Sequence, residues 1–290
     1  GSPEERPLAL FIQALPLFLL YPLRRIGTWM LFVAIWLHLQ ESLPHLNRLE
    51  ALLIALACER TVAEAVLPWV GILAKWAIVG KYRAGSYRFW GGYYLRWWLV
   101  DQTLLLCGRG LFRHTQTGLR LYHTLLGAKI GRNCKFHPST RIAEHDLVHI
   151  GDECLVDDVA LRAFCLEGGH VRLSPIVLGR GVTVCTKASV VPGIRVPPGA
   201  VLGPLTSSYE DCARESCAES ARFCTQSFPD PPLYLKLVGW VAVLCVWVAC
   251  QMPLLLVLRE MCLQPWYKKS LKGYADVLER FLLICFGVSF

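Results

Sequence analysis

The chain has 290 residues, of which 54% are hydrophobic and 18% charged, and its formal net charge is +8. This length accommodates one or two domains, and the apolar content is too high for an ordinary soluble protein, so we expect membrane contact. The basic excess fits cytoplasmic flanks of membrane segments better than nucleic-acid binding, because no aromatic–basic RNA motif or zinc-finger spacing is present.

The sequence begins Gly1-Ser2-Pro3 and ends inside the apolar run 281–290, so we expect a piece of a longer polypeptide. Most of its 13 cysteines lie in apolar runs and indicate small core residues in a reducing compartment. Three others share a polar stretch, where a metal or disulfide site is the alternative to free thiols. Their spacing is not CxxC and no histidine is near, which favours free thiols at Cys212, Cys217 and Cys224.

Residues 1–80 are predicted to form transmembrane helices. The apolar runs 8–21 and 26–39 are each shorter than the about 20 residues of a full span, and Arg24-Arg25 between them predicts a cytoplasmic turn. A longer apolar helix follows over 63–79, with Pro68 as a kink.

Residues 81–129 form an aromatic-rich lead-in. Arginines alternate with tyrosines and tryptophans over 81–98, a composition typical of a membrane–water interface, with a ligand groove as the alternative. Residues 103–126 predict one helix, which Gly127 ends.

A six-residue repeat occupies 130–208. Its period fits neither a helix nor a flat strand and predicts a left-handed parallel β-helix, in which each hexapeptide forms one side of a triangular coil. A slim residue follows four positions after each apolar one, and a glycine often follows directly. The repeating apolar residues are Ile130, Phe136, Ile142, Ile150, Val156, Leu178, Val184, Val190, Val196 and Leu202.

The repeat is interrupted twice, over 144–149 and over 161–171. Insertions in a solenoid bulge from one face, which is usually the face that binds ligands. Four of the eight histidines lie in the repeat region, namely His137, His145, His149 and His170.

Residues 209–233 are polar and proline-rich and predict a linker, and 234–290 predict further transmembrane helices. The strongest candidate span, 235–258, contains Gln251 and Pro253, and a break there would form a re-entrant hairpin. That hairpin would return the basic stretch 259–272 to the cytoplasmic side. We therefore expect a multi-pass membrane protein with a cytoplasmic β-helix.

Four motifs in order resemble the membrane-embedded terminal region of ε-poly-lysine-synthetase-like, nonribosomal-peptide-synthetase-like proteins. They are KYRxGxYxxW at 81–90, YYLRWW at 93–98, LLGAKIG at 125–131 and DLVHIGD at 146–152. The resemblance covers roughly 81–208, and the hexapeptide repeat alone is shared with many acyltransferases.

This resemblance implies an acyl or aminoacyl transferase that forms amide bonds from a carrier-bound phosphopantetheine thioester and an amine. The implied partners are the lipid bilayer, upstream adenylation and carrier domains, and neighbouring β-helix domains in the same chain or a homotrimer. Two alternatives remain: a non-catalytic scaffold copy that completes a pseudo-trimer, and a hexapeptide acetyltransferase that uses acyl-CoA. No metal and no directly bound cofactor are expected.

The second interruption carries the expected catalytic groups. The family pattern there has a Thr-His pair, whereas this chain has Phe164 at the histidine position, which cannot accept a proton. His170 in the same loop, or His149, would then act as the base, with Glu167 orienting it or binding the amine. Surface or structural roles are the alternative for each of these residues.

Three basic residues are candidates for the phosphate groups of the pantetheine donor, with solvated corner residues as the alternative. They are Arg162, Lys187 and Arg195.

Overall fold

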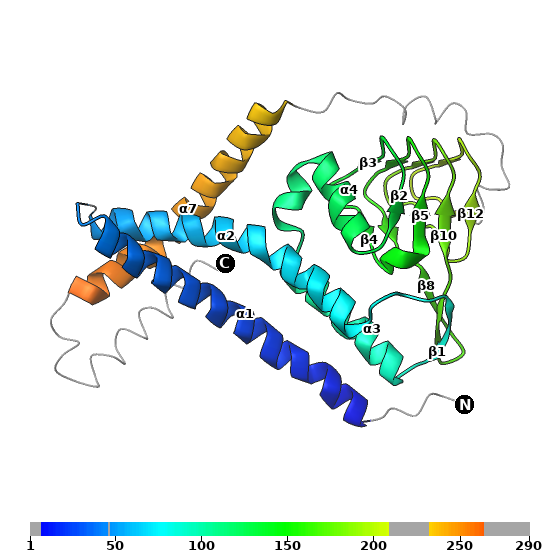
Figure 1. Ribbon diagram of the computed structural model, residues 1–290, viewed down its shortest axis with the longest axis horizontal. Coiled ribbons are helices and arrows are strands. Elements are labelled where there is room, and N and C mark those ends of the chain that lie inside the picture. Colours follow the sequence, from blue (N-terminus) through cyan, green and yellow to red (C-terminus); the bar gives the residue numbers. More distant parts are fainter. Residues whose placement is uncertain (1–6, 46, 209–231, 264–290) are drawn as a thin grey trace. The chain divides into compact units, whose positions relative to one another are not determined.

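A computed structural model of the chain describes residues 7–45, 47–208 and 232–263 (Figure 1). Most of the predicted linker with its three cysteines, and residues 264–290 of the last predicted membrane region, lie outside the described residues. The chain divides into two compact units. The first comprises Gly1–Ile26 and Val62–Pro229, and the second comprises Gly27–Thr61 and Asp230–Phe290.

Three long helices are α1 (Pro7–Ser42), α2 (Arg48–Ile78) and α7 (Leu233–Leu263). By length and composition alone, two stretches are apolar enough to cross a membrane, Phe18–Ser42 in α1 and Leu233–Cys250 in α7. Among the described residues, these are the two candidate spans.

Two predicted interruptions of these helices are wrong. The α1 helix continues through Arg24-Arg25, and α7 continues through Gln251 and Pro253, so the structure shows neither the turn nor the re-entrant hairpin. Arginine is a good helix former, and an internal proline kinks a helix without ending it where the flanking residues keep their backbone hydrogen bonds.

The hexapeptide region forms a parallel coil with three sides (Figure 1). One side has the strand order β12-β10-β5-β2, the second β13-β11-β6-β3, and the third pairs β4 with β7 and Ser189 with Ser207. These parallel sheets fit the left-handed β-helix that the repeat predicts. The first side contains β2 (Lys129–Ile130), β5 (Val148–Ile150), β10 (Ile176–Leu178) and β12 (Arg195–Val196). The others contain β3 (Lys135–Phe136), β6 (Leu155–Val156), β11 (Thr183–Val184), β13 (Val201–Leu202), β4 (Arg141–Ile142) and β7 (Ala160–Leu161).

The core of this coil consists of the repeating apolar residues. Nine of the ten are buried, and Ile130 at the first coil packs against them partly exposed. Several of the slim residues four positions on are buried as well, including Cys134, Thr140, Cys154 and Val182. The six-residue period therefore places its apolar members inside, as predicted.

Helical segments precede the coil, and the predicted single helix over 103–126 is wrong. The structure has α3 (Gly92–Cys107), a short helix η1 (Gly110–His114) and α4 (Gln116–Leu125) instead. Gly108 and Gly110 both adopt positive φ angles, which end α3, and the Thr115 side chain accepts a hydrogen bond from Gly118 N to begin α4.

The two interruptions of the repeat form different structures. The first contains a short helix, η2 (His145–Leu147), which Glu144 precedes in a left-handed conformation. The second is an antiparallel hairpin of β8 (Phe164–Glu167) and β9 (His170–Leu173), and β1 (Gly85–Arg88) from the aromatic lead-in adds a third strand beside β9.

Glycines after the apolar positions stack at a corner where neighbouring coils approach closely. A Cβ at Gly151 would lie 2.7 Å from the carbonyl carbon of Gly179. We predict that Gly151→Ala lowers the free energy of unfolding by about 1–3 kcal/mol, because the backbone of the next coil must move. Gly92→Ala is the control, because nothing lies within 4 Å of a Cβ there. Chemical unfolding followed by circular dichroism measures both, and equal stability of the two variants would contradict the close approach.

Candidate functional site

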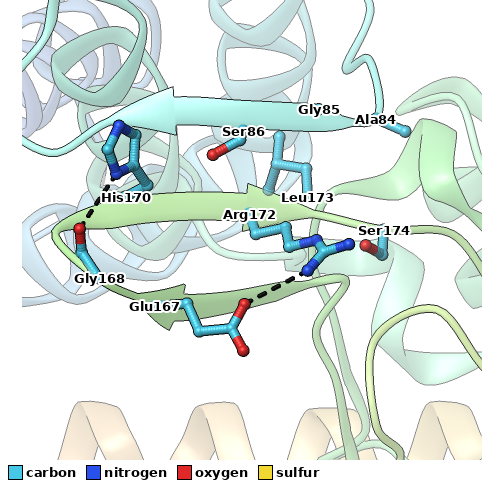
Figure 2. A pocket seen from close by; sticks show the side chains of 9 residues that line it. All are labelled: Ala84, Gly85, Ser86, Glu167, Gly168, His170, Arg172, Leu173 and Ser174. Carbon is cyan, nitrogen blue, oxygen red and sulfur yellow. Dashed lines mark hydrogen bonds and ion pairs between the residues drawn. The ribbon is translucent and has the colours of Figure 1, made fainter.

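The hairpin borders an open pocket of about 770 Å³ in the first unit (Figure 2). Figure 2 shows His170 and Arg172 on the middle strand, with Glu167 and Ser86 on the strands at either side. The pocket thus combines the second interruption of the repeat with a strand from the aromatic lead-in. Its lining residues are Ala84, Gly85, Ser86, Glu167, Gly168, His170, Arg172, Leu173 and Ser174.

The imidazole of His170 has a defined hydrogen-bonding state in this pocket. Its Nδ1 lies 3.1 Å from the carbonyl oxygen of Gly168 at the hairpin turn. A carbonyl oxygen only accepts hydrogen bonds, so Nδ1 carries the proton in this contact and Nε2 of the neutral ring bears a lone pair. Nε2 has no hydrogen-bond partner within the described ranges and is therefore positioned to accept a proton.

Glu167 is the cross-strand neighbour of His170, but its carboxylate has a different partner. The Arg172 Nη1 atom lies 3.4 Å from Glu167 Oε2, and both side chains are mostly exposed. The structure brings the predicted residues Glu167 and His170 into one pocket without a hydrogen bond between them. Sequence reasoning did not select Arg172, whose position opposite Ser86 becomes visible only once β1 joins the hairpin.

The other predicted residues lie elsewhere on the β-helix. His149 and Arg195 share one side of the coil, on either side of Val177 in the register. His149 is half-buried, and its partial burial and the neighbouring Lys129 lower its pKa. Lys187 adopts a left-handed conformation in a turn and forms an ion pair of 2.6 Å with Asp158.

Arg162, predicted to bind phosphate, belongs to a network at the root of the hairpin. Its Nη2 atom lies 3.2 Å from Glu144 Oε1 and 3.3 Å from Asp101 Oδ1. Arg141 Nη2 also donates to both carboxylate oxygens of Asp101, at 2.9 and 3.0 Å. A phosphate group at Arg162 would compete with these two carboxylates for the guanidinium.

Glu144 connects the two interruptions of the repeat. Its side chain is 1% exposed, and its carboxylate accepts hydrogen bonds from Trp97 Nε1 at 2.8 Å and from Ala163 N at 3.0 Å, besides Arg162. Burial raises the pKa of Glu144, and Arg162 and the hydrogen-bond donors oppose that rise. Because Ala163 directly precedes β8, these bonds fix the root of the hairpin that carries His170.

Phe164 occupies the position where the resemblance implies a histidine. Its ring contacts Trp97 at a centroid distance of 5.1 Å, and the Arg162 guanidinium lies 4.5 Å from its centroid. An aromatic ring here packs beside the carboxylate network and stacks with its cation. The residue therefore has a packing role at the root of the hairpin.

The sequence analysis did not predict that His123 and His145 form a buried pair. His123 Nδ1 lies 3.2 Å from His145 Nε2, and both side chains are almost completely buried. Burial lowers the pKa of His145 to about 3 and that of His123 well below its usual value, so both rings are neutral at neutral pH. Only the packing of α4 against the first interruption brings them together, and sequence spacing carries no signal for that contact.

In the part of the chain that the structure describes, no three His, Cys, Asp or Glu side chains gather closely enough to hold a metal ion.

The parallel coil has the architecture of a hexapeptide-repeat protein, and sequence comparison finds acetyltransferase-like relatives. No protein-family model matches the chain. It is 28% identical over 140 residues to proteins of Escherichia coli K12 and Shigella flexneri named "Putative colanic acid biosynthesis acetyltransferase WcaF". Each alignment covers 39% of this chain and 75% of the relative.

Solved structures of similar proteins have lower similarity. A hexapeptide-repeat-containing acetyltransferase from Vibrio cholerae is 12% identical, with a TM-score of 0.21, over 32% of this chain and 81% of that one. Serine acetyltransferase isoform 3 from Entamoeba histolytica is 15% identical, with a TM-score of 0.17, over 60% of this chain and 69% of that one. The acetyltransferase-like part of the predicted resemblance is supported, and the setting in a peptide-synthetase-like protein stays a prediction.

The network at Glu144 predicts a measurable effect on the hairpin. Glu144→Gln places an amide N–H₂ among three donors, so we expect the free energy of unfolding to fall by about 2–4 kcal/mol. We also expect faster hydrogen exchange in residues 164–173. Glu153→Gln is the matched control, because Glu153 also has a positive φ and an arginine partner but is exposed. Unchanged exchange in the hairpin of Glu144→Gln would refute the network's role.

The buried histidines predict a loss of stability in mild acid. Both folded pKa values lie below 6.5, so the unfolded chain binds protons that the folded chain does not as pH falls below that value. The free energy of unfolding should fall by up to about 1.4 kcal/mol per pH unit for each histidine. Urea unfolding in detergent between pH 7.5 and 5.5 measures this slope. The double variant His123→Gln/His145→Gln should have a smaller slope of stability against pH, whereas the exposed control His137→Gln should keep the slope of the unaltered protein. Equal slopes in the unaltered protein, the double variant and the control would refute the role of the buried histidines.

Proposed function

We propose that this chain is an acyltransferase domain that transfers an acyl group from acyl-CoA to a hydroxyl or amine, with His170 as the general base. The observation that carries the proposal is the Nδ1 contact of His170 with Gly168, which leaves Nε2 able to accept a proton beside an open pocket. The similarity to acetyltransferases named WcaF supports the reaction class.

The reaction needs a nucleophile, an activated acyl group and a proton acceptor. His170 Nε2 removes the proton as the acceptor oxygen or nitrogen attacks the thioester carbonyl. The tetrahedral intermediate then expels the thiolate, which takes the proton back from the imidazolium. The Gly168 carbonyl oxygen stabilises that imidazolium through Nδ1–H, and Arg172 lies in the same pocket as a cation for developing negative charge.

The donor has two possible sources that share the pantetheine thioester. Acyl-CoA is the donor that the acetyltransferase relatives favour, and a carrier-bound phosphopantetheine thioester is the donor implied by the resemblance to peptide-synthetase-like proteins. His149 and Arg195 share one side of the coil, a surface along which an extended pantetheine arm could lie. His149, Arg195 and Lys187 would contact the donor.

The hairpin pocket is open to solvent in this chain. His170, Glu167 and Arg172 are all exposed, whereas a proton-transfer site works best with water excluded. We propose that a neighbouring β-helix, from the same polypeptide or a second copy, covers the pocket. Candidate spans in α1 and α7 support attachment to a lipid bilayer, and the multi-pass topology with a cytoplasmic coil belongs to the same proposal.

An acyl-transfer assay tests the catalytic assignment. With acetyl-CoA or acetyl-pantetheine as donor and a panel of amines and alcohols, we expect thiol release and an acylated product by mass spectrometry. His170→Ala should lower kcat/KM by about 10²–10⁴-fold, because the proton acceptor is lost. His137→Ala should change it less than about twofold, because His137 is exposed on the coil outside the pocket.

The outcomes separate the alternatives. Full activity of His170→Ala would refute the assigned base and direct attention to His149. Absence of product from every donor, with the folded protein verified by circular dichroism, would favour the non-catalytic scaffold. Activity with acetyl-pantetheine attached to a carrier domain but not with acetyl-CoA would favour the peptide-synthetase-like setting.

A further inference from the structure

A second cavity, of about 230 Å³, lies within the first unit and shares no residue with the hairpin pocket. It is formed by α3, α4 and the corner of the β-helix at the first interruption of the repeat. Its size exceeds that of engineered apolar cavities of roughly 150 Å³ that admit a benzene ring. The residues considered below are therefore arranged around a space large enough for a small organic molecule.

The two buried histidines line this cavity with unpartnered atoms. His123 and His145 both border it, and among the described residues neither His123 Nε2 nor His145 Nδ1 has a hydrogen-bond partner. A buried polar atom without a partner costs roughly 1–3 kcal/mol, so the fold is expected to satisfy both with something that enters the cavity.

The contact between the rings fixes what these outer atoms offer. One proton lies between His123 Nδ1 and His145 Nε2, donated by one ring to the other. Each neutral ring carries one N–H, so one outer nitrogen is a donor and the other is an acceptor, whichever ring donates. The pair therefore matches a ligand group that both donates and accepts, such as a hydroxyl or an amide.

The charged residues of the cavity are already paired within the protein. Asp101 is bound by Arg141, Glu144 accepts three hydrogen bonds, and Arg109 donates to the backbone carbonyls of Pro138 and Thr140. Two carboxylates and two guanidinium groups line the cavity, so their formal charges cancel. A charged ligand would lose its hydration without a free counter-charge to replace it.

Most of the remaining lining residues are apolar or aromatic, including Tyr82, Trp97 and Leu104. We propose that this cavity binds a small uncharged molecule that carries a hydroxyl or amide group on an apolar frame. The group contacts the histidine pair, and the frame packs against the aromatic walls. This site is separate from His170 and does not rest on the proposed acyl transfer.

Binding of three single-ring probes tests the ligand class with the unaltered protein. Phenol carries the matching hydroxyl, toluene lacks it, and benzoate replaces it with a charge. We expect saturable phenol binding by calorimetry, about tenfold weaker toluene binding, and no benzoate binding at pH 7.5. In protein with ¹⁵N-labelled histidine, phenol should also shift the imidazole nitrogen resonances of His123 and His145.

Variants locate the binding to the histidine pair. His145→Phe removes the unpartnered nitrogen and should weaken phenol binding by tenfold or more, whereas the exposed control His137→Phe should leave it unchanged. If His145→Phe does not fold, the probe series with the unaltered protein decides. Equal affinity for phenol and toluene, absence of saturable phenol binding, or undiminished binding to a folded His145→Phe would each overturn the proposal.

Discussion

The hydrogen bonds of one buried carboxylate join the parts of this structure that bear on function. Glu144 lies in the first interruption of the repeat, and its carboxylate accepts hydrogen bonds from Trp97 in α3, from Arg162 and from the backbone N–H of Ala163. A buried carboxylate is stable only with such partners, because protein donors must replace the hydrogen bonds to water that it loses on burial. The position of the hairpin is therefore tied to the lead-in helix and to the first interruption.

The hairpin illustrates how a regular solenoid acquires a site. The coil alone presents short strands with solvated turns, and its core is a narrow column of apolar side chains. Replacing one stretch of repeat by β8 and β9, and adding β1 beside them, creates a three-stranded sheet that borders a pocket. His170 takes its hydrogen-bonding state from the turn of this hairpin, so its chemistry depends on the departure from the repeat.

The first unit has two cavities of different character, and Glu144 lines the smaller one. The hairpin pocket is open and carries exposed charged residues, which suits a polar donor and a transferred proton. The cavity beside α3 and α4 is smaller, contains paired charges and has a neutral histidine pair. Trp97 lines the second cavity and also contacts Phe164 at the start of the hairpin, so one side chain packs against both parts of the structure.

The sequence by itself determined the coil, because a six-residue apolar period has one regular solution and local spacing is sufficient to express it. It also placed the two interruptions and selected His170 and Glu167, which the hairpin brings to one pocket. Tertiary structure alone decided the partners of Arg162, the pairing of β1 with β9 and the contact of His123 with His145. These contacts join residues 18 to 88 positions apart through helix packing and strand pairing beside the coil, and no local pattern encodes such pairings.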